Sequence, residues 1–255
     1  MSDGIVARLR ASLDRPADFG EVLAGDWGAA TAAELARRPV LVTGNGAASL
    51  GDLFEVKGSP AGRIRLQGDL SNATGLGAGL AGGEVIVEGS VGADAGLGMS
   101  GGTIDIRGDA GPRAGGAAPE ARRGMTGGEL IVRGNAGAEA GSRMRRGLLA
   151  VGGDTAPLAG VGTLAGTIVV MGDAGASAGL WSKRGTIVAL GKVAIPSTYR
   201  YACTYRPTIL RLTLARLGKR FGLGVEDRHV SGLYHRYSGD LADLGKGEIL
   251  AWTAA

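Results

Sequence analysis

A glycine-bounded motif recurs through the middle of the chain, between Gly51 and Gly191. In each copy two glycines six positions apart enclose alternating apolar residues, as in Gly83–Gly89 and Gly166–Gly172. The opening glycines fall at positions 62, 83, 102, 128, 147, 166 and 185, so that most copies are 19 residues apart. A fixed period of this size indicates stacked structural repeats.

Alternating apolar residues predict that each copy forms a β-strand with one apolar face. Nineteen residues are too few for a strand and a crossover helix, but they suffice for one turn of a parallel β-helix. We therefore predict an all-β fold, a right-handed parallel β-helix of about seven to eight coils, with an N-terminal cap and a C-terminal helix plus tail. In this fold Val87, Ile106 and Val132 would stack in one column.

The repeat divides the chain into three predicted parts. Residues 1–50 form an N-terminal capping segment with a short helix, which begins at Thr31 because Glu34 completes a capping box. Residues 51–195 hold the repeats, and residues 196–255 form a C-terminal helix and a docking tail. The apolar stripe predicted for this last helix comprises Ile209, Leu210, Leu212, Leu214, Leu217 and Phe221.

Composition restricts the compartment and the partners. A single cysteine cannot form an internal disulfide, so we predict a cytoplasmic protein. No apolar run is long enough to cross a membrane. The net charge of +4 does not require nucleic acid, and we predict none.

The outward positions of the predicted strands change in character along the repeat. Early strands place charged residues outward, whereas late strands place apolar residues there. An apolar face must be covered, either by the tail of the same chain or by another protein. The second alternative predicts a partner interface at Leu148, Val169, Met171, Val188 and Leu190.

Basic pairs precede two of the opening glycines at equivalent positions. Arg145 and Arg146 precede Gly147, and Lys183 and Arg184 precede Gly185. Further basic residues, Arg122 and Arg123, lie in the longest interval between copies. This pattern indicates a contact for an anionic chain or an acidic partner, and a solvated basic edge is the alternative.

A polar residue with a short side chain follows most closing glycines. The carboxylate and amide members of this row are Asp69, Asp109, Asn135, Asp154 and Asp173. Such a row could hold a cation, or each side chain could bond the backbone of its own turn. We favour local turns and predict no metal site, because metal ligands converge rather than form a line.

Residues typical of catalytic sites are scarce. The chain has two histidines, His229 and His235, and its only cysteine is Cys203. A Cys203–His229 dyad is an alternative to structural roles for these residues. Known hydrolase and zinc motifs are absent from the sequence, so we predict no catalytic residues and no cofactor bound by this chain alone.

The repeat and the tail together resemble a known family. The pattern Gly-Gly-x-Ile-x-Val-x-Gly-x-Ala-Gly, with Met99 and Met125 before two glycine pairs, resembles the Gly-x-Gly-x-Gly β-helix family. That family includes the C-terminal domain of the large glutamate synthase polypeptide and the C-type subunit of formylmethanofuran dehydrogenase. The segments Leu50–Gly58, Tyr199–Pro207 and Gly239–Ile249 look like the latter. The Ala- and Arg-rich composition is similar to its bacterial branch, in formyltransferase/hydrolase complexes.

The resemblance implies a four-subunit complex of one-carbon metabolism. Such a complex transfers a formyl group between formyl-tetrahydromethanopterin and a methanofuran-type carrier, and it releases formate. The implied partners are hydrolase-like, dehydrogenase-B-like and formyltransferase subunits, with this chain as a scaffold. The resemblance also implies that the oligoglutamate arm of the carrier could meet the basic pairs. The alternatives are the C-type subunit of a molybdenum- or tungsten-dependent formylmethanofuran dehydrogenase, and a self-standing β-helix binding protein.

Overall fold

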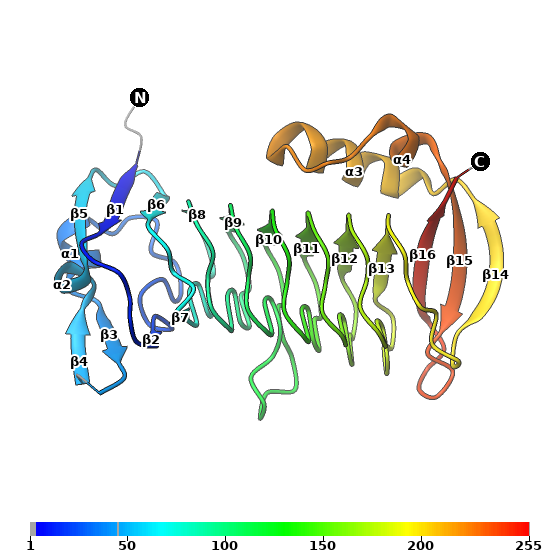
Figure 1. Ribbon diagram of the computed structural model, residues 1–255, viewed down its shortest axis with the longest axis horizontal. Coiled ribbons are helices and arrows are strands. Elements are labelled where there is room, and N and C mark those ends of the chain that lie inside the picture. The colour runs from blue at the N-terminus through cyan, green and yellow to red at the C-terminus, as the bar shows by residue number, and fades with distance from the viewer. Residues whose placement is uncertain (1–3, 45, 255) are drawn as a thin grey trace.

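A computed structural model describes residues 4–44 and 46–254, and it shows an elongated, mostly β molecule (Figure 1). The principal sheet has 12 strands among these residues, in the order β14-β15-β16-β13-β12-β11-β10-β9-β8-β6-β1-β5. A second sheet has the order β4-β3-β2-β7 and lies at the N-terminal end of the molecule.

The repeats supply the middle of the principal sheet. Their strands are β6 (Arg63–Gln67), β8 (Glu84–Val87), β9 (Thr103–Ile106), β10 (Glu129–Val132), β11 (Leu148–Val151), β12 (Thr167–Val170) and β13 (Thr186–Ala189). Neighbours in this series pair parallel and in register, one repeat with the next. Val87 pairs with Ile106 and Ile106 with Val132, which confirms the predicted column.

A second parallel ladder returns the chain from each central strand to the next. Its successive bridges join Leu70, Val91, Ala110, Ala136, Thr155, Ala174 and Val193. The apolar core lies between this ladder and the inward side chains of the sheet, since Ile104 and Ala110 belong to one buried cluster. Glycine is needed where the turns approach closely: a Cβ atom at Gly172 would collide with the carboxylate of Asp154.

The N-terminal end of the molecule is closed by short elements. They are β1 (Ile5–Leu9), β2 (Ala17–Asp18), α1 (Ala32–Ala36), β3 (Pro39–Val42), β4 (Gly46–Ser49), α2 (Leu50–Leu53), β5 (Phe54–Gly58) and β7 (Ala73–Thr74). The predicted capping box of α1 is confirmed, because Thr31 and Glu34 exchange backbone and side-chain hydrogen bonds of 2.7 and 3.2 Å. Strand β1 lies between β6, with which it pairs parallel, and β5, with which it pairs antiparallel.

The C-terminal end carries a meander and two helices. The elements are β14 (Arg200–Tyr205), α3 (Thr208–Phe221), α4 (Asp227–Ser231), β15 (Leu233–Gly239) and β16 (Gly247–Thr253). Strand β16 extends the parallel series beside β13, and β15 and β14 follow it antiparallel. The predicted helix after Pro207 is confirmed, and it ends at Gly222, whose φ of 64° is the left-handed C-cap conformation.

The predicted fold class, an all-β right-handed parallel β-helix, is wrong. The principal sheet is mixed, with antiparallel pairs at both ends, and four helices accompany it among the described residues. The repeats are predicted over residues 51–195, but β5, which lies within this range, runs antiparallel beside β1. The glycine-bounded pattern specifies only how the strand of one repeat pairs with the strand of the next repeat. The end segments add β1 and β16 parallel to the series, and the chain then reverses in β5 at one end and in β15 at the other.

The predicted division at residues 50/51 and 195/196 stays a prediction. One apolar cluster crosses both positions, since it extends from Ile5 to Ile249.

Candidate functional site

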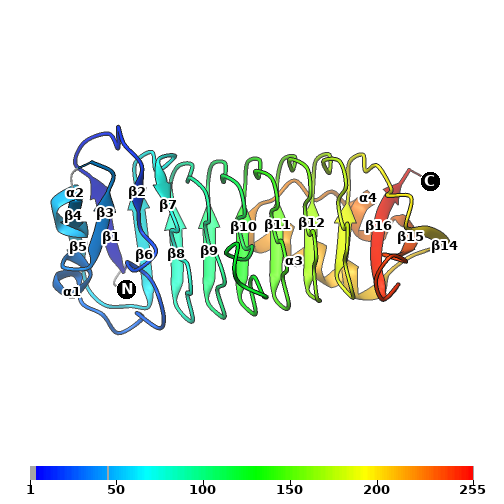
Figure 2. The ribbon, with the colours of Figure 1, turned by 90° about the horizontal axis from the view of Figure 1, so that it is seen from below.

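Helix α3 covers the outward face of the late strands. Its buried side chains Leu210, Leu214, Leu217 and Phe221 form one cluster with the outward residues of the sheet. Those outward residues are Ile131, Leu148, Ala150, Val169, Val188, Leu190 and Leu250, with Met171 partly buried beside them. Figure 1 shows α3 lying along this part of the sheet, and Figure 2 shows it behind β10 to β13.

This placement bears on the predicted partner interface. Leu148, Val169, Val188 and Leu190 are all buried, and Met171 packs against the same cluster. Of the two alternatives for covering the face, the structure shows the chain's own tail. A partner's contact with these five residues stays a prediction, and it would require α3 to move.

Charged contacts fix the C-terminal half of α3 to strand β10. The carboxylate of Glu129 pairs with the guanidinium groups of Arg216 and Arg220. The helix itself carries four basic residues, Arg211, Arg216, Lys219 and Arg220, and no acidic residue. Glu129 therefore offsets only part of the positive charge of α3.

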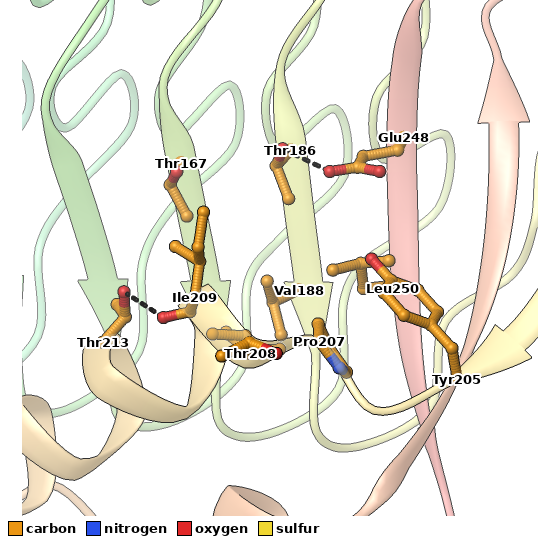
Figure 3. A pocket seen from close by; sticks show the side chains of 11 residues that line it. Thr167, Thr186, Val188, Tyr205, Pro207, Thr208, Ile209, Thr213, Glu248 and Leu250 are labelled. Carbon is orange, nitrogen blue, oxygen red and sulfur yellow. Dashed lines mark hydrogen bonds between the residues drawn. The ribbon is translucent and has the colours of Figure 1, made fainter.

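Two hollows lie between the N-terminal half of α3 and the starts of the strands. The first has a volume of about 350 Å³ and includes Thr186, Ile209 and Glu248 in its lining (Figure 3). Glu248 accepts a hydrogen bond of 2.8 Å from the Thr186 hydroxyl there. The second, of about 390 Å³, includes Leu212 and Arg216. Both are lined by Thr167 and Thr213, so they adjoin along the helix, and together they are called the groove.

The predicted basic residues lie at exposed turns. Arg122, Arg123, Arg145, Arg146 and Arg184 are exposed, and within the described residues none of their side chains has an acidic partner. Lys183 is half-buried, and its Nζ atom lies 3.6 Å from Oδ2 of Asp243 in the tail.

Backbone hydrogen bonds hold the basic turns in place. The amide of Arg145 donates to Met125 O at 2.8 Å, and the amide of Lys183 donates to Thr163 O at 2.7 Å. The long interval between repeats is tied down by Arg143, which donates to Pro119 O and Ala121 O. The geometry thus presents these cations on rigid turns.

The row of polar residues bonds between repeats and not within turns. Each side chain accepts a hydrogen bond of 2.6 to 2.9 Å from the backbone amide of the next residue in the row. Asp109 accepts from Asn135, Asn135 from Asp154, and Asp154 from Asp173. Only Asp69 forms the predicted local turn, with the amide of Ser71 at 3.0 Å. The prediction of local turns is therefore wrong for the later repeats, because the in-register stacking brings the next amide within reach.

The histidines have packing roles in the tail. The Nδ1 atom of His229 accepts the amide of Glu226 at 3.1 Å, and its ring packs edge-on against Trp252. Burial lowers the pKa of His229. His235 contacts the Thr204 hydroxyl through Nδ1 at 2.6 Å, and Cys203 is exposed on β14. The Cys203–His229 dyad stays an untested alternative to the predicted structural roles.

The described residues contain neither a metal cluster nor a membrane-spanning helix. No group of three or more His, Cys, Asp or Glu side chains among them could hold a metal ion. No helix that they form is long and apolar enough to cross a membrane.

Comparison with solved structures identifies a relative over the full length. The fold matches a chain in the X-ray crystal structure of the formyltransferase/hydrolase complex (FhcABCD) from Methylorubrum extorquens in complex with methylofuran. The TM-score is 0.77 and the identity 31%, over 98% of this chain and 100% of the other. No family model matches the chain, and no curated protein matches it. The chain belongs to the family of this component of a formyltransferase/hydrolase complex.

Sequence reasoning placed two residues of α3 on the wrong face. The predicted apolar stripe includes Ile209 and Leu212, yet they are 81% and 74% exposed. At 100° per residue, Leu210, Leu214 and Leu217 share one face and these two residues lie on another, but the contact of the leucine face with the sheet decides which face is buried.

Proposed function

We propose that this chain is the C-type subunit of a formyltransferase/hydrolase complex and serves it as a non-catalytic scaffold. The supporting observation is the match along the whole length to a chain of the FhcABCD complex. The proposed reaction is transfer of a formyl group between formyl-tetrahydromethanopterin and a methanofuran-type carrier, with release of formate. The methylofuran in the related crystal structure supports that class of carrier.

The proposed partners are a hydrolase-like, a dehydrogenase-B-like and a formyltransferase subunit, in the cytoplasm. In this arrangement the chemistry belongs to the partners. The stack of in-register strands suits a scaffold, because it holds the residues of successive repeats at fixed spacings.

Purification from the native host through a tag on this chain tests the proposal. We expect the three partners in mass spectra of the purified material, together with formyl transfer and formate release. The chain expressed alone should show neither activity. Molybdenum or tungsten in the complex would favour a dehydrogenase instead, and a monomer without partners would contradict the scaffold role.

We further propose that the exposed basic turns contact the anionic arm of the carrier. The support is the exposure of Arg122, Arg123, Arg145, Arg146 and Arg184, whose side chains have no acidic partner within the described residues. Long-range attraction of this kind weakens as salt is added.

A charge-removal experiment on the whole complex tests this contact. In the variant, Arg145, Arg146 and Arg184 are replaced by Ala, and the probe is an oligoglutamate peptide. A matched control replaces Arg37, Lys192 and Lys246, which are exposed elsewhere. We expect weaker binding and a smaller salt dependence in the first variant only. Equal binding of the two variants at low salt would contradict the contact.

A further inference from the structure

The exposed face of α3 carries a helix-packing pattern. Ile209, Leu212, Arg216 and Lys219 are separated by three, four and three residues. This spacing places their side chains along one stripe of the helix, opposite the stripe of Leu210, Leu214 and Leu217 that faces the sheet. Residues at this spacing form the contact stripe by which one α-helix packs along another.

The stripe is divided into an apolar half and a basic half. At its N-terminal end, Ile209 and Leu212 are among the most exposed large apolar residues in the described chain. At its C-terminal end stand Arg216 and Lys219. Glu129 pairs with Arg216, and no acidic side chain in the described part of the chain pairs with Lys219.

The groove beside the stripe offers room for a second element. Its two hollows share Thr167 and Thr213 and run past Ile209 and Leu212. Its floor is a row of residues at the starts of neighbouring strands, since Glu129, Leu148, Thr167, Thr186 and Glu248 pair in register. Figure 3 shows Ile209 beside Thr167, with Thr186 and Glu248 farther along the floor. A ligand lying there would touch both the helix and the sheet.

The distribution of charge selects the occupant. A second copy of α3 is unfavourable in either direction, because a parallel pair would oppose cation with cation and an antiparallel pair would oppose cation with aliphatic side chain. Single-stranded nucleic acid is bound through aromatic stacking, and this stripe has no aromatic side chain. A membrane-surface helix would turn a broad apolar face outward, but the broad apolar face of α3 is buried on the sheet.

We propose that the exposed stripe of α3 docks an α-helix of another subunit of the complex. That helix would place aliphatic side chains against Ile209 and Leu212 and carboxylates against Arg216 and Lys219. The inference rests on the proposed function, since it requires that this chain has partner subunits. It adds the surface and the chemistry of the contact.

Assembly of the full complex around a tagged chain provides the first test. Replacing Ile209 and Leu212 by Asp removes the aliphatic contact and adds charge that repels a carboxylate, so recovery of the contacting subunit should fall about tenfold or more. Replacing Lys219 by Glu should give a smaller loss, of about threefold, which disappears at high salt. Leu41→Asp is the matched control, since Leu41 is 58% exposed on β3, which belongs to the second sheet and not to the sheet that α3 covers. Thermal unfolding of each purified chain confirms that it is folded.

Cross-linking identifies the neighbour directly. A photoreactive amino acid at position 212, in the assembled complex, should capture a helical peptide of another subunit that contains aliphatic and acidic residues. Capture of a second copy of this chain, or of a basic peptide, would overturn the inference.

The outcomes separate the two proposals. If the unaltered tagged chain recruits no other subunit, the proposed function fails and the docking surface falls with it. If the unaltered chain and the Ile209→Asp/Leu212→Asp variant recruit every subunit equally, only the docking inference fails.

Discussion

The outer face of the principal sheet has two halves with the same strand spacing and opposite surfaces. Over β6, β8 and β9 most outward residues are charged, and several pair across strands, as Arg63 does with Glu84 at 2.6 Å. Over β10 to β13 and β16 the outward residues that lie beneath α3 are apolar, such as Ile131, Val169 and Leu250. The inward column of apolar residues fixes the stack in both halves, whereas the outward residues decide whether water or a helix covers the outer face.

The two halves contribute unequally to stability. An exposed ion pair is worth about 0–1 kcal/mol, whereas full burial of an aliphatic side chain is worth about 1.5–3 kcal/mol. At the boundary, Arg133 on β10 binds Asp105 on β9 through two hydrogen bonds of 2.9 Å. That pair is the most buried ionic contact of the outer face, with Asp105 only 7% exposed.

The largest effect should come from opening the covered half. Leu214 is fully buried between α3 and the sheet, so Leu214→Ala should lower the free energy of unfolding by about 2–5 kcal/mol. Denaturant unfolding measures this change. A loss below about 1 kcal/mol would mean that α3 contributes little to folding and that the covered half resembles the open one.

Removal of the boundary carboxylate should have an intermediate effect. Asp105→Ala leaves the guanidinium of Arg133 half-buried without its bidentate partner. We expect a loss of about 2 kcal/mol in unfolding free energy. The double variant with Arg133→Ala measures the coupling between the two residues, and additive losses would show that they do not interact.

The covered half should also respond to alkaline pH through Tyr234. Its hydroxyl donates to His229 O at 2.7 Å, and burial raises the pKa of Tyr234 above its usual 10.0. Because the folded pKa exceeds the unfolded one, this contribution is complete below pH 10 and is lost as the pH rises through the folded pKa. Tyr234→Phe should cost about 1 kcal/mol at neutral pH. The variant should also lose part of the alkaline dependence of unfolding free energy, and an unchanged dependence would argue against this assignment.

The smallest effect should come from the open half. Arg65 pairs with Glu88, and both side chains are about a third exposed or more. Arg65→Ala should therefore change the unfolding free energy by less than about 1 kcal/mol, and less again in high salt. A loss comparable to that of Leu214→Ala would erase the difference between the halves.

Local pattern was sufficient for some elements and not for others. The alternation of Val85 and Val87 predicts a strand and its apolar side, and the Thr31–Glu34 box predicts where α1 begins. Strand β5 has the same alternation, but its direction depends on where the chain enters the sheet, which alternation does not encode. The exposed cations of the basic turns are predictable because they precede repeat glycines. The exposed stripe of α3 is not predictable, because Ile209 and Leu212 look like core residues until the position of the helix on the sheet is known.

The parallel, in-register middle of this protein is specified locally, because a glycine-bounded period of mostly 19 residues repeats both the apolar column and the turns that return the chain. The mixed ends of the sheet and the outward side of α3 are not specified in this way. These depend on contacts between segments far apart in the chain, such as β1 with β6 and Glu129 with Arg216, and no local pattern contains both partners.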